Sequence, residues 1–353
     1  MNFLTSTDHA NRIPISIITG FLGSGKTTLL NQLTRQIGMD SIALIINEFG
    51  EIGIDNLLVE TAIENTLLLE NGCICCSVRG DLIDTVNDLF AKVRNGVIPG
   101  FSRIVIETTG LAEPGPIVNM LTSERVITSR CQLDNVISCI DGVQGKIQTQ
   151  RYPEAMKQIA QADIGLITKR DLISAADAAD LETFVTEINP ALRLVEIERG
   201  HVSPDMLFAP SSKYAGISFS PLYETVSGYG HDDHSTDHLH KHSHDHSREH
   251  HHGDVSTWSF VDSTPLDRGR LFVWLQMLYS LRASYMLRLK GLVRLDGYSD
   301  PILLQAVGPV LDDPLYLTGW PGDEEKTRLV LITQGLAEPG LSRSFERYVL
   351  ATA

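Results

Sequence analysis

The feature that most constrains this chain is a glycine-rich segment, GFLGSGKT, that runs from Gly20 to Thr27. It matches GxxxxGK[ST] at every fixed position. It also lies between an apolar run at 13–19 and apolar residues at helical spacing from Leu29 onward. This strand–loop–helix context distinguishes a phosphate-binding loop from an incidental glycine-rich turn. The sequence therefore predicts that backbone N–H groups and a helix N-terminus surround phosphate oxygens here.

The residue types in this loop predict separate tasks. Lys26 is expected to reach the β- and γ-phosphates, and the hydroxyl of Thr27 is expected to ligate Mg²⁺. Both would neutralise charge on a transferring phosphoryl group, so both are predicted to be catalytic. The other nucleotide contacts are expected from Gly20, Gly23, Ser24, Gly25 and Thr28.

A second candidate segment, ETTG at 107–110, follows the apolar run IVI. The carboxylate of Glu107 is placed to hold Mg²⁺ or its water, and the N–H of Gly110 is placed to sense the γ-phosphate. Glu107 is therefore the third predicted catalytic residue. Either Glu107 or Glu48 could orient the attacking water, and the sequence leaves both open.

A third segment, TKRD at 168–171, follows another apolar run and resembles the guanine-reading NKxD motif. In that motif the aspartate accepts hydrogen bonds from the ring N–H and the exocyclic amine of the base. Thr168, Lys169 and Asp171 are therefore predicted to bind the base, with GTP preferred over ATP. Thr168 replaces the usual asparagine, so one base contact is altered and the strictness of the preference is open.

Short apolar runs alternate with helical patterns over residues 13–200, which predicts an α/β fold. Runs without polar alternation are typical of parallel strands covered by helices on both faces. The strands are expected at 13–19, 42–46, 104–106, 136–140, 164–167 and 192–197, and helices at 81–93 and 175–188. The predicted organisation is a P-loop domain at 1–202, a flexible His-rich linker at 203–256 and a small α+β domain at 257–353. In the last domain Arg288, Lys290 and Arg294 are expected on a solvated sheet face.

The net charge and the distribution of apolar residues exclude several classes of protein. With 29 Lys and Arg against 44 Asp and Glu, the net charge is 29 − 44 = −15, and a phosphate backbone would repel this 353-residue chain. No apolar run approaches the ~18 residues of a membrane span, and the start lacks a secretory pattern. We expect no nucleic-acid partner, no membrane and a cytoplasmic location.

Three of the five cysteines, Cys73, Cys75 and Cys76, lie within four positions. Such clustering favours metal or redox chemistry over a disulfide framework. Thiolates suit Zn²⁺ or Cu(I), and three of them leave a tetrahedral site one ligand short, which is typical of a site that transfers metal. Cys139, inside the apolar run VISCI, is predicted to be a core residue.

Histidines form a second candidate metal-binding group, because ten of the twelve lie in one Asp-rich tract. A tract of this composition is expected to bind transition metals weakly and to load or buffer the cysteine site. The alternative is a linker that only solubilises. The ten residues are His231, His234, His238, His240, His242, His244, His246, His250, His251 and His252.

The segments GxxGSGKTT, NEFGEIGID, GCICC, ETTGLAEP and TKRD, in this order, resemble the CobW-type metallochaperone GTPases, relatives of HypB and UreG. The His-rich tract and LRLKGLVRLDG are similar to that family's linker and C-terminal domain. The resemblance implies nucleotide-driven delivery of a transition metal to a client apo-protein, with zinc the favoured cargo. It also implies Glu48 as the fourth metal ligand, because the family's NEFGE segment lies close to the cysteines.

The leading hypothesis is therefore a GTP-hydrolysing zinc chaperone that uses GTP, Mg²⁺ and Zn²⁺. The first alternative is cobalt delivery for cobalamin synthesis or another Co/Fe enzyme, and the second is a metal store or sensor with a vestigial GTPase. A small-molecule kinase would share the P-loop but gives GCICC no role. Self-association that depends on nucleotide or metal stays open.

Overall fold

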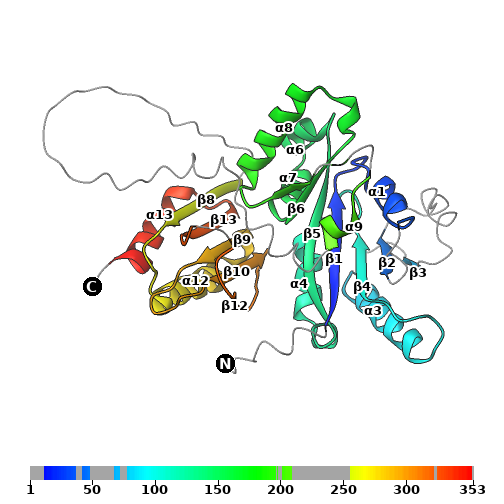
Figure 1. Ribbon diagram of the computed structural model, residues 1–353, viewed down its shortest axis with the longest axis horizontal. Coiled ribbons are helices and arrows are strands. Elements are labelled where there is room, and N and C mark those ends of the chain that lie inside the picture. The colour runs from blue at the N-terminus through cyan, green and yellow to red at the C-terminus, as the bar shows by residue number, and fades with distance from the viewer. Residues whose placement is uncertain are drawn as a thin grey trace, which may run out of the picture.

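The computed structural model describes residues 12–36, 42–47, 67–71, 78–195, 197, 201–208, 255–321 and 324–351. The described residues form two sheets with their helices, and the second sheet lies beside the first (Figure 1). The predicted boundaries near residues 202 and 257 stay predictions, because the chain between Phe208 and Val255 lies outside these ranges.

The first sheet has seven strands in the order β3-β2-β4-β1-β5-β6-β7, and each neighbouring pair is parallel. The bounds are β1 Ile13–Gly20, β2 Ile42–Asn47, β3 Leu67–Asn71, β4 Arg103–Glu107, β5 Cys131–Asp141, β6 Ile164–Thr168 and β7 Arg193–Val195. The predicted parallel α/β sheet is confirmed. Strand β3 was not expected from the sequence.

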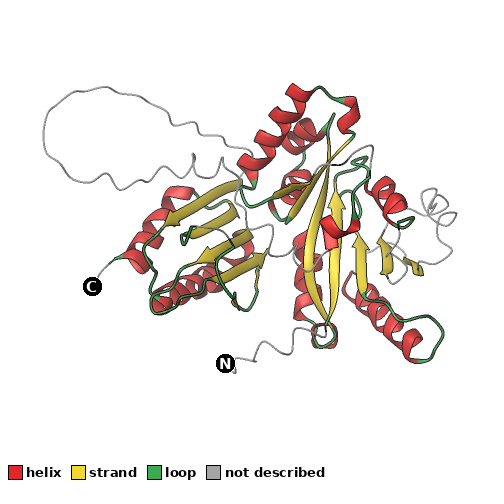
Figure 2. Cartoon of the chain, in the orientation of Figure 1, coloured by secondary structure: helices red, strands yellow, loops and turns green. Residues whose placement is uncertain are grey.

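Helices cover both faces of this sheet (Figure 2). Strand β1 shows why: Ile15 and Ile17 join one apolar cluster and Ile18 joins the other, since successive side chains point to opposite faces. One face is covered by α1 (Lys26–Leu33) and α9 (Pro204–Phe208). The other is covered by α3 (Val78–Arg94), α4 (Pro114–Ser123), α7 (Pro153–Ala160) and α8 (Ala175–Ile188). Shorter helices α5 (Arg125–Thr128), α6 (Gly145–Arg151) and η1 (Arg170–Leu172) lie in the connections.

The C-terminal domain is an antiparallel sheet in the order β11-β10-β9-β13-β8, with β12 paired to β10. Its strands are β8 Val255–Asp262, β9 Met286–Val293, β10 Ile302–Val307, β11 Val310–Leu311, β12 Leu315–Tyr316 and β13 Thr327–Gln334. The helices α12 (Arg268–Arg282) and α13 (Glu338–Phe345) cover one face, where Trp274 of α12 and Phe345 of α13 pack against each other and against Trp258 of β8. Turns η2 (Ala283–Tyr285) and η3 (Glu346–Leu350) complete the domain. The predicted α+β class is confirmed.

The opposite face of this second sheet is buried against the domain that contains the parallel sheet. Leu287, Val307, Val330 and Ile332 belong to the same apolar cluster as residues of α4 and α7. The hydroxyl of Thr257 also donates to the carbonyl of Ile188 at 2.9 Å. The two domains therefore share part of one core.

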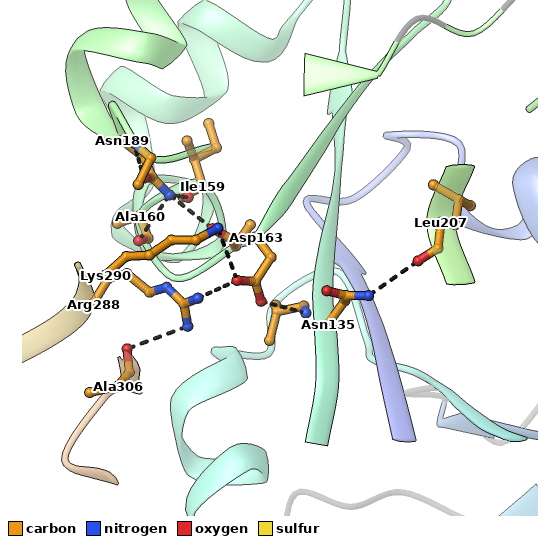
Figure 3. A network of polar contacts seen from close by, with 12 residues as sticks. Asn135, Ile159, Ala160, Asp163, Asn189, Leu207, Arg288, Lys290 and Ala306 are labelled. Carbon is orange, nitrogen blue, oxygen red and sulfur yellow. Dashed lines mark hydrogen bonds and ion pairs between the residues drawn. The ribbon is translucent and has the colours of Figure 1, made fainter. Parts of the chain in front are cut away.

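Two charged residues on this face correct the sequence analysis. Arg288 and Lys290 were expected in solvent, but they are 1% and 4% exposed, and both approach Asp163 at the start of β6 (Figure 3). The second oxygen of Asp163 accepts the N–H of Val136 at 3.0 Å. Arg294, the residue directly after β9, was also expected in solvent and is partly exposed. Arg288 and Lys290 do lie on a sheet face as expected, but that face lies against the neighbouring domain.

The charged residues that meet between the two domains carry more positive than negative charge, because Lys290, Arg288 and Arg193 surround the single carboxylate of Asp163. Burial is the main cause that lowers the pKa of Lys290 to about 8; the positive charges of Arg288 and Arg193 contribute to this shift, and Asp163 opposes it. A lysine with this pKa loses its proton in the folded protein at a pH where the unfolded chain still holds it.

We predict that the free energy of unfolding rises with pH across the range from about 8 to 10.5, the folded and ordinary pKa values of Lys290. Between pH 8 and 9, the free energy of unfolding of the wild-type chain should rise by roughly 1 kcal/mol relative to that of Lys290→Met. Urea unfolding at each pH measures this, and the other titrating groups cancel because both proteins contain them. Parallel stability curves for the two proteins would contradict the prediction.

Candidate nucleotide-binding site

The glycine-rich loop joins β1 to α1, and its glycines are required by its shape. Gly20, Gly23 and Gly25 have φ of 140°, 73° and 91°, in the region that side chains with a Cβ disfavour. A Cβ on Gly20 would also lie 2.4 Å from the carbonyl oxygen of Cys139. The loop therefore packs directly on the end of β5, and larger residues could not replace Gly20.

Lys26 begins α1, and its side chain folds back across the loop. Its ammonium donates to the carbonyl oxygens of Gly20 at 2.9 Å and Phe21 at 3.3 Å. Thr27, on the first turn of the helix, is half-buried, whereas Thr28 is exposed. The ammonium is thus held at the loop, where a phosphate oxygen could exchange with a carbonyl acceptor.

Strand β4 brings the second predicted segment to the same place. Glu107 ends the strand, is buried, and pairs in register with Ile18 of β1. The hydroxyl of Thr108 donates to that of Thr19 at 3.0 Å. A Cβ on Gly110 would lie 2.7 Å from the backbone nitrogen of Leu22, so the loop after β4 touches the glycine-rich loop.

A residue that the sequence analysis missed holds this second loop. The side-chain amide of Gln158, on α7, donates to the carbonyl oxygens of Gly110 at 3.1 Å and Ala112 at 3.0 Å. One turn later Gln161 accepts the N–H of Gly115 at 2.9 Å, at the start of α4. No local sequence signal marks either glutamine, because the contact depends on α7 packing beside the loop.

Strand β6 brings the third segment. The hydroxyl of Thr168 donates to the carbonyl oxygen of Ser24 at 2.7 Å and to that of Ile140 at 3.2 Å. Thr168 therefore fastens the turn after β6 to the glycine-rich loop, a role that the sequence did not predict for it. Lys169 and Asp171 are exposed, with Asp171 in η1, where it is open to a ligand.

The predicted metal ligands lie outside the described residues: Cys73, Cys75, Cys76, Glu48 and the ten histidines from His231 to His252. In the part of the chain that the structure describes, no group of three or more His, Cys, Asp or Glu side chains could hold a metal ion. Cys139 is buried as predicted, and burial raises the pKa of its thiol to about 12. It is a core residue and a poor thiolate.

The fold and the glycine-rich loop define the class as a P-loop nucleotide-binding protein. The model of the CobW/HypB/UreG nucleotide-binding domain matches residues 14–196, and that of the cobalamin synthesis protein CobW C-terminal domain matches 255–349. The chain belongs to the CobW/HypB/UreG family.

Within the described residues, no helix combines the length and apolar composition needed to cross a bilayer.

Relatives match over almost the whole chain. The chain is 30% identical to the zinc chaperone YjiA of Escherichia coli K12 over 334 residues, which cover 93% of this chain and 96% of the relative. It is 29% identical to the zinc chaperone CobW of Pseudomonas aeruginosa over 364 residues, with coverage of 94% and 90%. The crystal structure of Zn(II)-bound YjiA GTPase from E. coli has a TM-score of 0.69 at 27% identity, with coverage of 96% and 99%.

We predict that Gly110→Ala separates the loop after β4 from the glycine-rich loop, because the new methyl group would overlap the backbone of Leu22. Stability should fall by about 1–3 kcal/mol, and binding of a nucleoside triphosphate should weaken. Thermal unfolding and nucleotide titration measure the two effects. Gly100→Ala is the matched control, since a Cβ there meets nothing within 4 Å. Equal behaviour of the two variants would contradict the prediction.

Proposed function

We propose that this chain binds and hydrolyses GTP and uses the nucleotide cycle to hold Zn²⁺ at Cys73, Cys75 and Cys76 and pass it to a client apo-protein. Family membership supports a metallochaperone role, and two of the relatives are named as zinc chaperones. The observation that carries the proposal is the register of three neighbouring strands, which relates the cysteine segment to the nucleotide site.

Strands β3, β2 and β4 end together. Asn71, the last residue of β3, is the register partner of Asn47, the last residue of β2. Ile46 of β2 is in turn the partner of Glu107. Neighbouring strands lie about 4.8 Å apart, so the ends of β3 and β4 are separated by roughly 10 Å.

Chain connectivity then limits where the cysteine segment starts. Cys73 follows Asn71 by two residues, and Glu48 follows Asn47 by one. Each residue extends the chain by at most about 3.6 Å, so both residues begin their segments at the edge that carries Glu107. This supports the proposal that Glu48 is the fourth metal ligand and that the metal segment acts together with the loop that carries Gly110.

In hydrolysis, a water oxygen attacks the γ-phosphorus, the bond from that phosphorus to the β–γ bridging oxygen breaks, and GDP leaves. Lys26 would exchange its carbonyl acceptors for phosphate oxygens and offset the charge that develops on them. The N–H of Gly110 would follow the γ-phosphate, while Gln158 holds the loop that carries it. Asp171 would accept the ring N–H and the amine of guanine.

Oxygen donors at this edge fit a magnesium ion. The Thr27 hydroxyl lies on the first turn of α1, and the buried Glu107 carboxylate ends a strand adjacent to β1. Such hard donors suit Mg²⁺, which retains several waters of its own. When bound with the nucleotide, Mg²⁺ would supply positive charge to the phosphate oxygens.

If the metal and the γ-phosphate share these loops, each must change the affinity for the other. We predict that the zinc dissociation constant differs at least fivefold between complexes with a non-hydrolysable GTP analogue and with GDP. Competitive titration against a zinc-binding dye measures it. The triple variant Cys73→Ser, Cys75→Ser and Cys76→Ser should lose this difference and the stimulation of hydrolysis by zinc. Equal zinc affinity in both nucleotide states would refute the coupled chaperone and favour a metal store or sensor.

We also predict that Lys26→Ala abolishes GTP hydrolysis and leaves binding of zinc to the cysteine site largely intact. Phosphate release and zinc titration report the two properties separately. Loss of both would indicate misfolding, which circular dichroism checks. The same titration with Co²⁺ tests the alternative cargo, and the His-rich tract is proposed as a weaker, auxiliary metal-binding segment.

A further inference from the structure

The turn that is proposed to read the base contacts a second turn, at 141–144, to which the proposed function gives no role. The first of these turns, 168–172, follows β6, and the second, 141–144, follows β5. The N–H of Gly142 donates to the carbonyl oxygen of Thr168 at 2.9 Å. A Cβ on Gly142 would lie 2.6 Å from that oxygen, so glycine permits the contact.

Lys169 has an unusual backbone conformation. Its φ of 53° is positive, and among the described residues that are not glycine no other has a positive φ. A lysine in this left-handed region is disfavoured by contact between its Cβ and the backbone, so surrounding interactions must hold it there.

Asp141 supplies such an interaction. One carboxylate oxygen accepts the N–H groups of Val143 at 2.9 Å and Gln144 at 3.0 Å, and the other accepts the ammonium of Lys169 at 2.6 Å. Asp141 is 3% exposed, whereas the Lys169 side chain is 38% exposed. The carboxylate is therefore the fixed end of the pair, and the lysine is the end that solvent and ligand can reach.

The geometry determines what this pair controls. The hydroxyl of Thr168 is hydrogen-bonded to the backbone of Ser24 and Ile140, which fixes the orientation of the backbone directly before Lys169. The direction of η1, and with it the place of Asp171, then depends on the backbone angles of Lys169.

We propose that Asp141 is a positioning residue for base recognition: it holds Lys169 in the left-handed conformation and thereby orients Asp171 toward the guanine edge. This inference rests on the proposed GTP-binding function. Asp141 acts through Lys169 and does not itself contact the nucleotide, so its effect appears in the preference for guanine over adenine.

The test uses the full chain and displacement of a fluorescent GTP analogue by unlabelled GTP or ATP. Asp141→Asn retains an oxygen for Val143 and Gln144 but loses the charge that holds Lys169. We expect GTP affinity to fall about tenfold, the size of one lost charge-assisted hydrogen bond, and ATP affinity to change much less. Asp180→Asn is the control, because it removes an exposed carboxylate that pairs with Lys146 at 2.6 Å. A GTP-to-ATP preference that stays within twofold of wild type in Asp141→Asn overturns the proposal.

A second pair of variants keeps the test independent of the folding of Asp141→Asn. Lys169→Gly and Lys169→Met both remove the ammonium, but only glycine adopts a positive φ without strain. We expect both variants to bind GTP more weakly than wild type, and the glycine variant to show a stronger preference for GTP over ATP than the methionine variant. Equal preference in the two variants would also overturn the proposal.

A third measurement separates this inference from the function on which it rests. Asp171→Asn should shift the preference from GTP to xanthosine triphosphate, whose base presents an acceptor where guanine has its amine. Failure of that shift would remove the proposed reading of guanine. If the shift occurs while the Asp141 and Lys169 variants keep full preference, only the positioning role is refuted.

Discussion

Parallel pairing is the constraint on which the rest of this molecule depends. When neighbouring strands run in the same direction, their carboxyl ends reach one edge of the sheet, and whatever follows each strand must begin there. Here that edge receives the glycine-rich loop after β1, the ETTG segment after β4 and the TKRD segment after β6. Strand β3 ends at the same edge, and Cys73 follows its last residue, Asn71, by two positions in the sequence. Residues separated by more than one hundred positions thereby become neighbours.

The loops at this edge are fastened to one another by direct contacts. The hydroxyl of Thr168 is hydrogen-bonded to the backbone of Ser24, and Gly110 lies against Leu22. The side-chain amide of Gln158 donates a hydrogen bond to the carbonyl oxygen of Gly110. A nucleotide bound there would meet a connected set of segments. Such a set gives a physical basis for mutual effects between phosphate, base and metal, because a displacement of one loop changes the contacts of the next.

The C-terminal domain is connected to these loops through α7. The helix carries Gln158 at one side of the nucleotide edge and leads into Asp163, which receives Arg288 and Lys290 from the second sheet. Asn189 donates to three carbonyl oxygens at the end of the same helix, those of Ile159, Ala160 and Ala162, and so fixes it in place (Figure 3). Burying two cations near one carboxylate is costly for stability, and the shared apolar core offsets that cost.

The sequence by itself determined the class of the fold, and it predicted three segments that the structure brings to one edge of the parallel sheet. Apolar runs without alternation, a GxxxxGKT loop between strand and helix, and motif order depend on local chemistry, so they are visible in one dimension. The expected helix at 175–188 agrees with α8, for example, since its apolar spacing is regular and Ser174 caps it. The cysteine and histidine ligands stay predictions, because they fall outside the described residues.

Tertiary structure decided what depends on partners distant in the chain. Lys290 and Arg288 follow the alternation of an exposed strand face, and only the docking of the two domains buries them. Gln158 and Asp141 carry no signal that distinguishes them from other polar residues near a strand or helix end, and the TKRD motif marks Thr168 without indicating its hydrogen bonds to Ser24 and Ile140. Their roles come from which backbone groups the parallel register and helix packing place within hydrogen-bonding distance, and a single sequence does not encode those distances locally.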